Sequence, residues 1–517
     1  MAIDVKAAGV SGSDPIARAV HLRAPVRKGT EQRFSSSDPS PGLDILRNPH
    51  IARIVHNRKF QFLLILPNQI VFWTVIFVGI FGTAIPGLNF GAAITWYVWF
   101  CLVFVMMVVV GRAWCAMCPF GGFAEWIQRK TFFQRTQKTL GLGRKFPESL
   151  AQFGFILPVV SFLILTWIEE FFNIAGPGNP AATSFMVIGI VGSALTFFMV
   201  FERRSFCRYF CPLTSLIGTV GSMGSVAGFR TRDREHCLSC ETKDCMRGGE
   251  EGFGCPWYTW PGSADSNLYC GLCTECYKSC PDGNVGLFLQ KPLTSVVAPT
   301  RRRADVAWAI ALLWGLVLYQ QLNFTQTYNS FDTWLNTHLS VPHYPDPVAY
   351  LGLIAAIALV VAGAARGISF LVARRDIDFS RPGSFMDRSS RFRAFFVPVA
   401  YGLIPVVGAD YFARQLPKFF KYSPRVIPSV GHLVGAMGTS STLYTTRLLS
   451  NPNIVSVQVG IIALGTLASL WTMWKITNRD LVPISRNVVA LRLMNIGLVL
   501  ACGVAAAALY VIMSAAN

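Results

Sequence analysis

Nine apolar runs, each close to 20 residues long, constrain what this chain can fold into. A helix needs about 20 apolar residues to cross the hydrocarbon core of a bilayer. Only 14% of the 517 residues are charged, whereas a soluble protein has about a quarter. The composition argues against a soluble enzyme and predicts an all-α polytopic membrane protein with about nine transmembrane helices. The runs are 61–84, 92–111, 151–170, 183–201, 305–322, 348–371, 394–409, 456–475 and 490–513.

Basic residues sort the connections between these runs into two sides. The connections after the second, fourth and sixth runs are rich in Lys and Arg, whereas 85–91, 171–182 and 323–347 contain neither. The positive-inside tendency therefore places the basic connections and the N-terminus in the cytoplasm, with the chain in a bacterial inner membrane. The net charge of +19 is then explained by the membrane surface, and no nucleic-acid partner is expected. Residues 410–455 depart from the pattern, because they are expected outside yet carry five Lys or Arg. An interfacial or re-entrant helix, or a span count wrong by one, would account for them.

Eight cysteines form two ferredoxin-like groups in the largest polar segment. The second group reads Cys-x2-Cys-x2-Cys-x3-Cys-Pro from Cys270 to Pro281, the run with which bacterial ferredoxins hold cubane clusters. In that run the fourth cysteine ligates the neighbouring cluster, and the first group has looser spacings. The pattern assigns one [4Fe-4S] cluster to Cys237, Cys240, Cys245 and Cys280, and a second to Cys255, Cys270, Cys273 and Cys276.

Zinc and disulfide bonds are the alternatives for these eight thiols. Zinc sites use isolated sets of four ligands and do not need a third cysteine two residues farther on, followed by Cys-Pro. Disulfide bonds need an oxidising compartment, whereas the charge bias places this segment in the cytoplasm. Iron–sulfur clusters are therefore the favoured interpretation.

Two further cysteine pairs lie where the second and fourth runs end. Cys115/Cys118 and Cys207/Cys211 share the frame Arg-x-aromatic-Cys-(x2 or x3)-Cys-Pro, and each pair follows a predicted helical hairpin. Such a repeat predicts a pseudo-two-fold axis that brings the four thiols together at the membrane surface. They are candidates for a third metal centre or for redox thiols, beside Arg112, Arg203, Arg204 and Arg208, whose charge lowers thiol pKa values and offsets cluster charge. The alternative is that they are packing cysteines at helix ends.

The repeated Cys-Pro frame, followed by the two-cluster segment, resembles the membrane polyferredoxin family over about residues 60–295. Members include quinol-oxidising subunits of periplasmic nitrate reductase systems and the membrane electron donor of nitrous oxide respiration, and a related branch reduces copper during oxidase assembly. The resemblance implies four spans with cytoplasmic clusters that carry electrons between the quinone pool and a redox partner protein. The chain departs from the family in the shorter Cys115/Cys118 spacing and in about five additional spans.

These observations divide the chain into four parts and lead to three hypotheses on function. The first is an electron-transfer protein of the respiratory chain, resembling a quinol dehydrogenase, with two [4Fe-4S] clusters, a third metal centre and quinone. The alternative is a metal-reducing maturation factor for a respiratory oxidase. A transporter in the last five spans, regulated by the clusters, is the third. The parts are a basic cytoplasmic tail (1–60), a four-span unit of two repeated hairpins (61–218), an α+β ferredoxin-like domain (219–300) and a C-terminal membrane unit (301–517).

Two ionisable residues at the outer end of the seventh run, Asp410 and Arg414, are candidates for lining a quinone or substrate pocket, with interface anchoring as the alternative. No catalytic residue is identified. Cys101 and Cys502 lie singly inside apolar runs and are interpreted as buried small hydrophobic residues.

Overall fold

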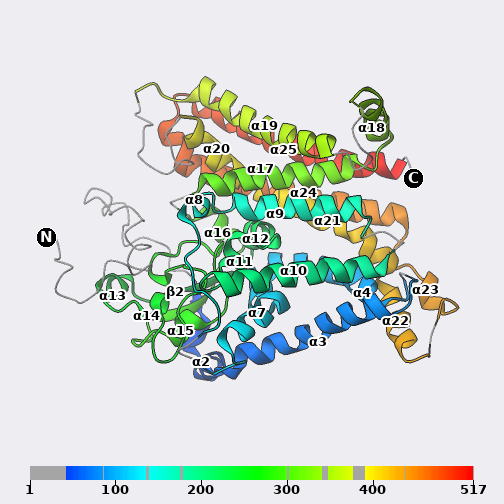
Figure 1. Ribbon diagram of the computed structural model, residues 1–517. Coiled ribbons are helices and arrows are strands. Elements are labelled where there is room, and N and C mark those ends of the chain that lie inside the picture. Colours follow the sequence, from blue (N-terminus) through cyan, green and yellow to red (C-terminus); the bar gives the residue numbers. More distant parts are fainter. Residues whose placement is uncertain are drawn as a thin grey trace.

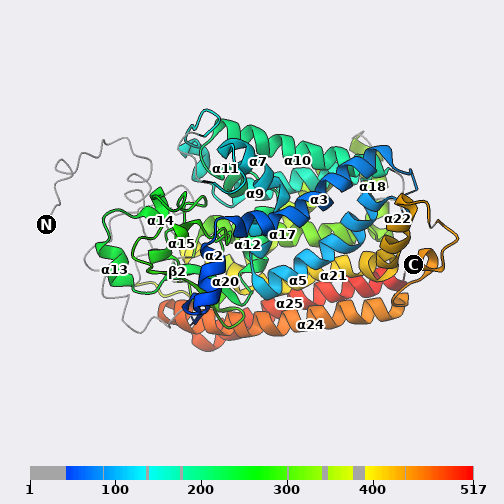
Figure 2. The same ribbon diagram turned by 90° about the horizontal axis from the view of Figure 1, so that it is seen from below.

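Helices lie side by side along one direction, with a smaller domain at one end of the bundle (Figure 1). In the view turned by 90°, the small domain again lies at one end of the helices (Figure 2). Residues 1–41 of the predicted tail lie outside the described part of the chain. The computed structural model describes residues 42–85, 87–134, 139–174, 179–299, 302–339, 347–376, 391–436 and 438–515.

The N-terminal membrane unit begins with a helical hairpin that a buried asparagine closes. Asn89 is fully buried; its side chain accepts from the backbone N–H of Ala92 and donates to the carbonyls of Val78 and Thr83. It therefore caps the second helix of the hairpin and holds it to the end of the first. The helices of the unit are α3 (Lys59–Phe81), the continuous helix made of α4 (Phe90–Ala93), the π-helical segment η4 (Ile94–Trp99) and α5 (Phe100–Val110), then α9 (Ile156–Phe171) and α10 (Pro180–Val200).

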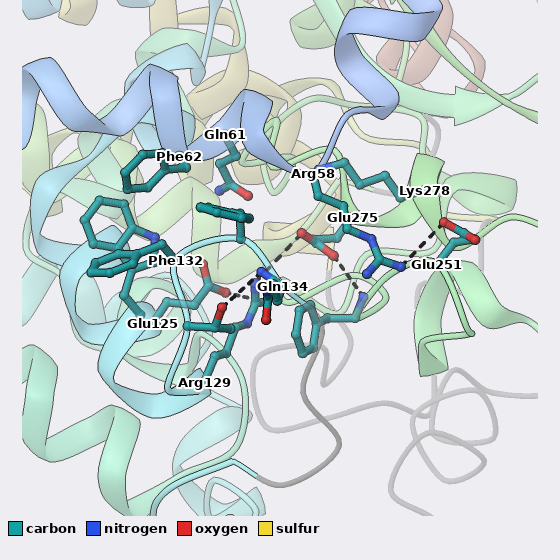
Figure 3. Close-up of a pocket in the computed structure, with 14 residues that line it drawn as sticks. Arg58, Gln61, Phe62, Glu125, Arg129, Phe132, Gln134, Glu251, Glu275 and Lys278 are labelled. Carbon is teal, nitrogen blue, oxygen red and sulfur yellow. Dashed lines mark hydrogen bonds and ion pairs between the residues drawn. The ribbon is translucent and has the colours of Figure 1, made fainter.

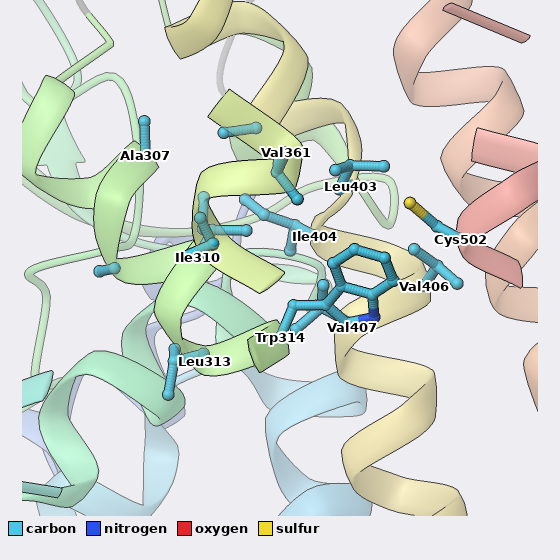
Figure 4. Close-up of a cluster of buried hydrophobic side chains, with 14 of the residues drawn as sticks. Ala307, Ile310, Leu313, Trp314, Val361, Leu403, Ile404, Val406, Val407 and Cys502 are labelled. Carbon is cyan, nitrogen blue, oxygen red and sulfur yellow. The ribbon is translucent and has the colours of Figure 1, made fainter. Parts of the chain in front are cut away.

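The C-terminal membrane unit is organised around α17 (Ala304–Leu322), which is apolar on all sides and 83% buried over its most apolar window. A helix of that kind belongs in the centre of a bundle. Figure 4 shows Trp314 of α17 packed near Val406, Val407 and Cys502. The surrounding helices are α19 (Pro347–Val372), α20 (Arg391–Gly402), α21 (Ile404–Tyr422), α24 (Asn451–Ile476) and α25 (Val488–Ala515).

Helices occupy all nine predicted apolar runs, but not all of them are long enough to cross a membrane. Within the described residues, seven helices meet the requirements of length and hydropathy. The pair formed by α20 and Ile404–Leu433, bent by 42°, makes an eighth if it is one broken span. The remaining predicted span corresponds to α9, which has only 16 residues. Length and composition therefore do not give the expected count of nine.

The basic segment after residue 410 continues α21. It contains the short helices η7 (Ser423–Arg425), α22 (Val426–Leu433) and α23 (Thr442–Thr445). Arg425 stacks between the rings of Tyr422 and Tyr444, 4.7 and 4.6 Å from their centroids. Aromatic contacts of this kind hold cations near a membrane boundary. The 42° bend lies before this segment, between α20 and Ile404, so the re-entrant or interfacial helix stays a prediction.

The small domain contains a three-stranded antiparallel sheet in the order β1-β3-β2. Its first strand, Leu43–Asp44, belongs to the end of the predicted tail and pairs with β3. Asp44 is buried there, and its carboxylate accepts a hydrogen bond from Arg232 Nε at 2.8 Å. Residues 43–56 therefore have a defined fold, which a two-residue strand is too short to reveal in the sequence. The elements are β1 (Leu43–Asp44), η3 (Ile45–Arg47), α2 (Pro49–His56), β2 (Val226–Thr231), α13 (Arg234–Ser239), α14 (Asp244–Arg247), α15 (Glu275–Lys278) and β3 (Val285–Leu289).

Candidate metal centres and the adjoining cavity

Four thiols of the small domain form what we call the distal set: Cys237, Cys240, Cys245 and Cys280. Burial, followed by the other three thiols, raises the pKa of Cys245 to about 12. The set is built from α13, α14 and the turn after α15. Cys237 Sγ lies 3.0 Å from the Thr231 hydroxyl and accepts from Asn284 Nδ2 at 3.3 Å. Polar donors around a thiolate sulfur tune a bound cluster.

A second group, the middle set, comprises Cys255, Cys270, Cys273 and Cys276. Burial and the three other thiols of the set raise the pKa of Cys276 well above its ordinary value. The backbone N–H of Phe229 donates to Cys270 Sγ and that of Thr259 donates to Cys255 Sγ, each at 3.4 Å. In each set the thiols interact electrostatically with one another, and the assignment of one cluster to each set stays a prediction.

Gly228 makes room for the middle set. Its φ is +88°, and a Cβ there would lie 2.8 Å from Cys270 Sγ and 2.9 Å from Cys270 Cβ. We expect Gly228→Ala to displace Cys270 and to lower the iron content by about four atoms per chain, because a [4Fe-4S] cluster needs all its thiolates in register. Iron analysis and electron paramagnetic resonance measure the loss. Gly189→Ala, where an added Cβ meets nothing within 4 Å, is the control. Equal iron in both variants would contradict the assignment of Cys270.

The four Cys-Pro thiols, Cys115, Cys118, Cys207 and Cys211, also come together, and we call them the edge set. Burial raises the pKa of Cys207 well above its ordinary value, and Cys211, Cys118 and Cys115 raise it further. Arg204 lowers the pKa of Cys207, as the sequence predicts for the arginines beside these thiols. The effect of burial is larger, so the thiol of Cys207 is neutral unless a metal displaces its proton.

The Cys-Pro frame places the second cysteine of each pair at the start of a helix. Cys118 precedes α7 (Pro119–Arg129), whose first backbone N–H groups face its sulfur. Cys211 stands in the same way before α12 (Leu213–Gly221). Burial raises the pKa of Cys118 to about 12 and that of Cys211 to about 11, and the helix N–H groups oppose the rise. Proline suits the first turn of a helix, and such a turn stabilises a thiolate.

Two buried arginines lie under the edge set. Arg112 and Arg204 are each 1% exposed, and Arg112 Nη2 is 3.8 Å from Cys115 Sγ. Arg204 pairs with Glu125, which also pairs with Arg129 at 2.6 Å. Burial alone would raise the pKa of Glu125, but the two arginines hold it below its ordinary value. The other two predicted arginines join the edge set to the small domain: Arg203 donates to the carbonyls of Met246 and Cys255, and Arg208 to that of Trp257.

The Glu125 network borders a small polar pocket of about 30 Å³ (Figure 3). Acidic and basic side chains alternate around it, with ion pairs from Arg129 to Glu275 and from Arg58 to Glu251. A volume of that size holds about two water molecules. The pocket therefore lies where the Glu125 network meets the small domain, through Glu275 and Glu251.

The three sets follow one another in space. Arg204 interacts electrostatically with Cys207 of the edge set and with Cys273 of the middle set. Gln61 bridges the same gap when its amide nitrogen faces the Cys273 carbonyl oxygen at 3.3 Å and its oxygen faces Arg204 Nη2 at 3.1 Å. The backbone N–H of Cys255 donates to the carbonyl of Cys245 at 2.8 Å, which joins the middle set to the distal set. The order is edge, middle, distal.

The three thiol sets differ from a site for a single metal ion. In the part of the chain that the structure describes, no three His, Cys, Asp or Glu side chains converge closely enough to hold one metal ion. Zinc, with Zn–S bonds of about 2.3 Å, needs such convergence. A cubane offers four separate iron atoms, one to each thiolate, so its ligands stand farther apart. Four thiols in each set match the number and type of ligands of a [4Fe-4S] cluster, and cluster binding stays a prediction.

A cavity of about 180 Å³, lined by helices of both membrane units, reaches the edge set. All four edge thiols line one end, and aromatic and aliphatic side chains line most of the remainder. On α9 the lining residues Phe162, Thr166 and Glu169 recur at helical spacing over about 10 Å of its length. The π-helical segment η4 lines the opposite wall. Segments of this kind occur mainly at functional sites.

The structure separates the two candidate pocket residues of α21. Arg414 lines the cavity, whereas Asp410 is fully buried elsewhere, bonded to Gln321 and to Tyr510 at 3.0 Å. The sequence reasoning missed Glu169, whose only signal was an ionisable residue at the end of an apolar run. It also missed Glu125, which lies seven residues after Cys118.

Comparison with known proteins supports an iron–sulfur protein. Residues 92–139 and 183–227 match a family model described as a 4Fe-4S binding domain. These stretches contain the two Cys-Pro pairs. An uncharacterised protein of Methanocaldococcus jannaschii is 25% identical over 190 residues, which cover 35% of this chain and 73% of that protein. No solved structure matches the chain. Together with the apolar helices, the match suggests a membrane iron–sulfur electron-transfer protein.

Proposed function

We propose that this chain is a membrane electron-transfer protein of the polyferredoxin type, which oxidises quinol in the cavity and passes the electrons to a redox partner. The observation that carries the proposal is that one apolar cavity ends at all four edge thiols. Quinone chemistry needs an apolar slot beside a one-electron centre. The cavity supplies the slot, and the thiols supply a place for the centre.

The edge set holds a [4Fe-4S] cluster in this proposal, rather than acting as redox thiols. Three features support a cluster: the family match covers both Cys-Pro pairs, four thiols converge, and Arg112 and Arg204 offset the negative charge of a thiolate cluster. Its iron atoms would replace the thiol protons that burial retains. The chain would then carry about twelve irons in three cubanes.

Electrons would leave through the distal set, which is nearest to the surface. Cys240 is partly exposed, and the adjoining Leu238 is 59% exposed. An exposed apolar residue beside a redox centre suits a transient contact with a partner protein. The basic connections support a cytoplasmic location of this end in a bacterium, by the positive-inside tendency.

Quinol-driven reduction of the purified protein, under anaerobic conditions, tests the proposal. We expect a short-chain quinol to bleach the iron–sulfur absorbance, and Leu165→Trp, which fills the cavity, to slow this reduction at least about tenfold. Reduction by dithionite should be unchanged, since it does not need the cavity. Leu467→Trp is the matched control, because Leu467 lies on α24 outside the cavity and is 62% exposed.

Two outcomes would overturn the proposal. Equal quinol-driven rates in both tryptophan variants would remove the cavity from the reaction. Wild-type protein that quinol does not reduce, and that carries exchangeable copper, would favour the metal-reducing maturation factor.

A further inference from the structure

We propose that the charged end of the cavity is the binding site for the quinol head group, and that Glu169 accepts its protons there. This inference rests on the proposed function. The cavity is apolar along most of its length, but polar side chains from three helices gather at the end remote from the thiols. They are Thr166 and Glu169 of α9, Gln320 of α17, and Arg414, Gln415 and Lys418 of α21.

Glu169 is a carboxylate that lines the cavity, and Lys418 interacts with it electrostatically. Among the described residues, no hydrogen-bond or ion-pair partner of its carboxylate is present. The neighbouring Glu170 also keeps a buried oxygen, Oε2, without a partner. Ionisable groups at membrane depth are costly and mark functional sites.

Two cations, Arg414 and Lys418, lie near the two carboxylates at this end of the cavity. Arg414 and Lys418 act electrostatically on Glu170, and Glu169 and Glu170 both act on Lys418. Lys418 Nζ lies 4.9 Å from the centroid of the Trp96 ring, and the Trp96 indole N–H donates to Thr183 Oγ1 at 2.9 Å. That contact fixes the lysine on one wall of the cavity. Arg414 Nε is a buried donor without a partner, which suits the oxygen of a quinone.

The proposed reaction separates electrons from protons. Oxidation of one quinol breaks two O–H bonds and yields one quinone, two protons and two electrons. The electrons cross the length of the cavity singly to the edge cluster, which the four edge thiols would hold at the other end. Each proton passes to Glu169, which transfers it to the unpartnered oxygen of Glu170 and releases it before the second arrives. Because α9 runs from the small domain to the opposite end of the bundle (Figure 1), the protons leave on the side away from the clusters.

Glu169→Gln tests the assignment in the complete chain. A general base contributes about 10²–10⁴-fold to a rate, so we expect quinol-driven cluster reduction to slow at least about 100-fold. The effect should fall on kcat, with little change in KM. Dithionite reduction and the spectra of the clusters should be unchanged, and Glu169→Asp should restore part of the rate. Glu148→Gln, at an exposed site before α9, should behave like wild type.

Vesicles with a trapped pH dye and with the small domain outward provide the second measurement. Quinol oxidation by an impermeant acceptor should acidify the lumen with wild-type protein, and not with Glu169→Gln. Equal rates in wild type and Glu169→Gln would overturn this inference while leaving the proposed function intact. Acidification of the outer medium would overturn the direction of proton release. Wild-type protein that quinol does not reduce would overturn both proposals.

Discussion

Cys207→Ser should remove the edge cluster and stop quinol from reducing the two clusters behind it. We expect the iron content to fall from about twelve to about eight atoms per chain. The quinol-driven rate should fall by at least about 100-fold, because the edge set is the only thiol set that the cavity touches among the described residues. Dithionite should still reduce the middle and distal clusters.

Cys101→Ser is the matched control for this substitution. Cys101 is 6% exposed and lies in α5, apart from the three sets. Its thiol has no polar role, so iron content and rate should stay at the wild-type values. An iron content of about eight in both wild type and Cys207→Ser would instead mean that the edge thiols act without a cluster.

Cys273→Ser should remove the middle cluster and interrupt the path between the other two. Quinol should then reduce the edge cluster alone, about one third of the centres that it reduces in wild type. The physical reason is the order in space: Cys273 faces Arg204 on the side of the edge set, and Cys255 is bonded to the distal set. Electron paramagnetic resonance of quinol-reduced and dithionite-reduced samples separates the centres.

Cys502→Ser provides the control for the middle cluster. Cys502 is 2% exposed in the core of the C-terminal unit (Figure 4), so both spectra should remain unchanged. An unaltered spectrum in Cys273→Ser would refute its role as a ligand. Full reduction of the distal cluster by quinol in that variant would refute the proposed order.

The assignment of cysteines to clusters stays a prediction, but short spacings already bring many of these cysteines together, because they leave the chain little freedom. Cys270, Cys273 and Cys276 lie within seven residues, so they meet whatever the surrounding fold. The edge set needed a different argument, the repeated Cys-Pro frame. The structure adds why it recurs: each proline starts a helix whose N–H groups face the preceding sulfur.

The cavity and its charged end could not be predicted in this way. Glu169, Gln320 and Arg414 come from helices about 90 to 250 residues apart in the sequence, and apolar periodicity does not state which helices become neighbours. Asp410 and Arg414 are four residues apart and looked equivalent, yet only Arg414 reaches the cavity, because α17 and α25 enclose Asp410 through Gln321 and Tyr510.

The sheet that joins β1 to β2 and β3 constrains how often the chain traverses the bilayer. Since Asp44 and Val226 belong to one sheet, both lie on the same side, and the chain between them makes an even number of passages. The long helices α3, α4–α5 and α10 supply three, so α9 has to supply the fourth. Its 16 residues span about 24 Å, less than the roughly 30 Å of the hydrocarbon core. A bilayer that α9 crosses would therefore have to thin beside it, which would bring the Glu169 carboxylate closer to bulk water.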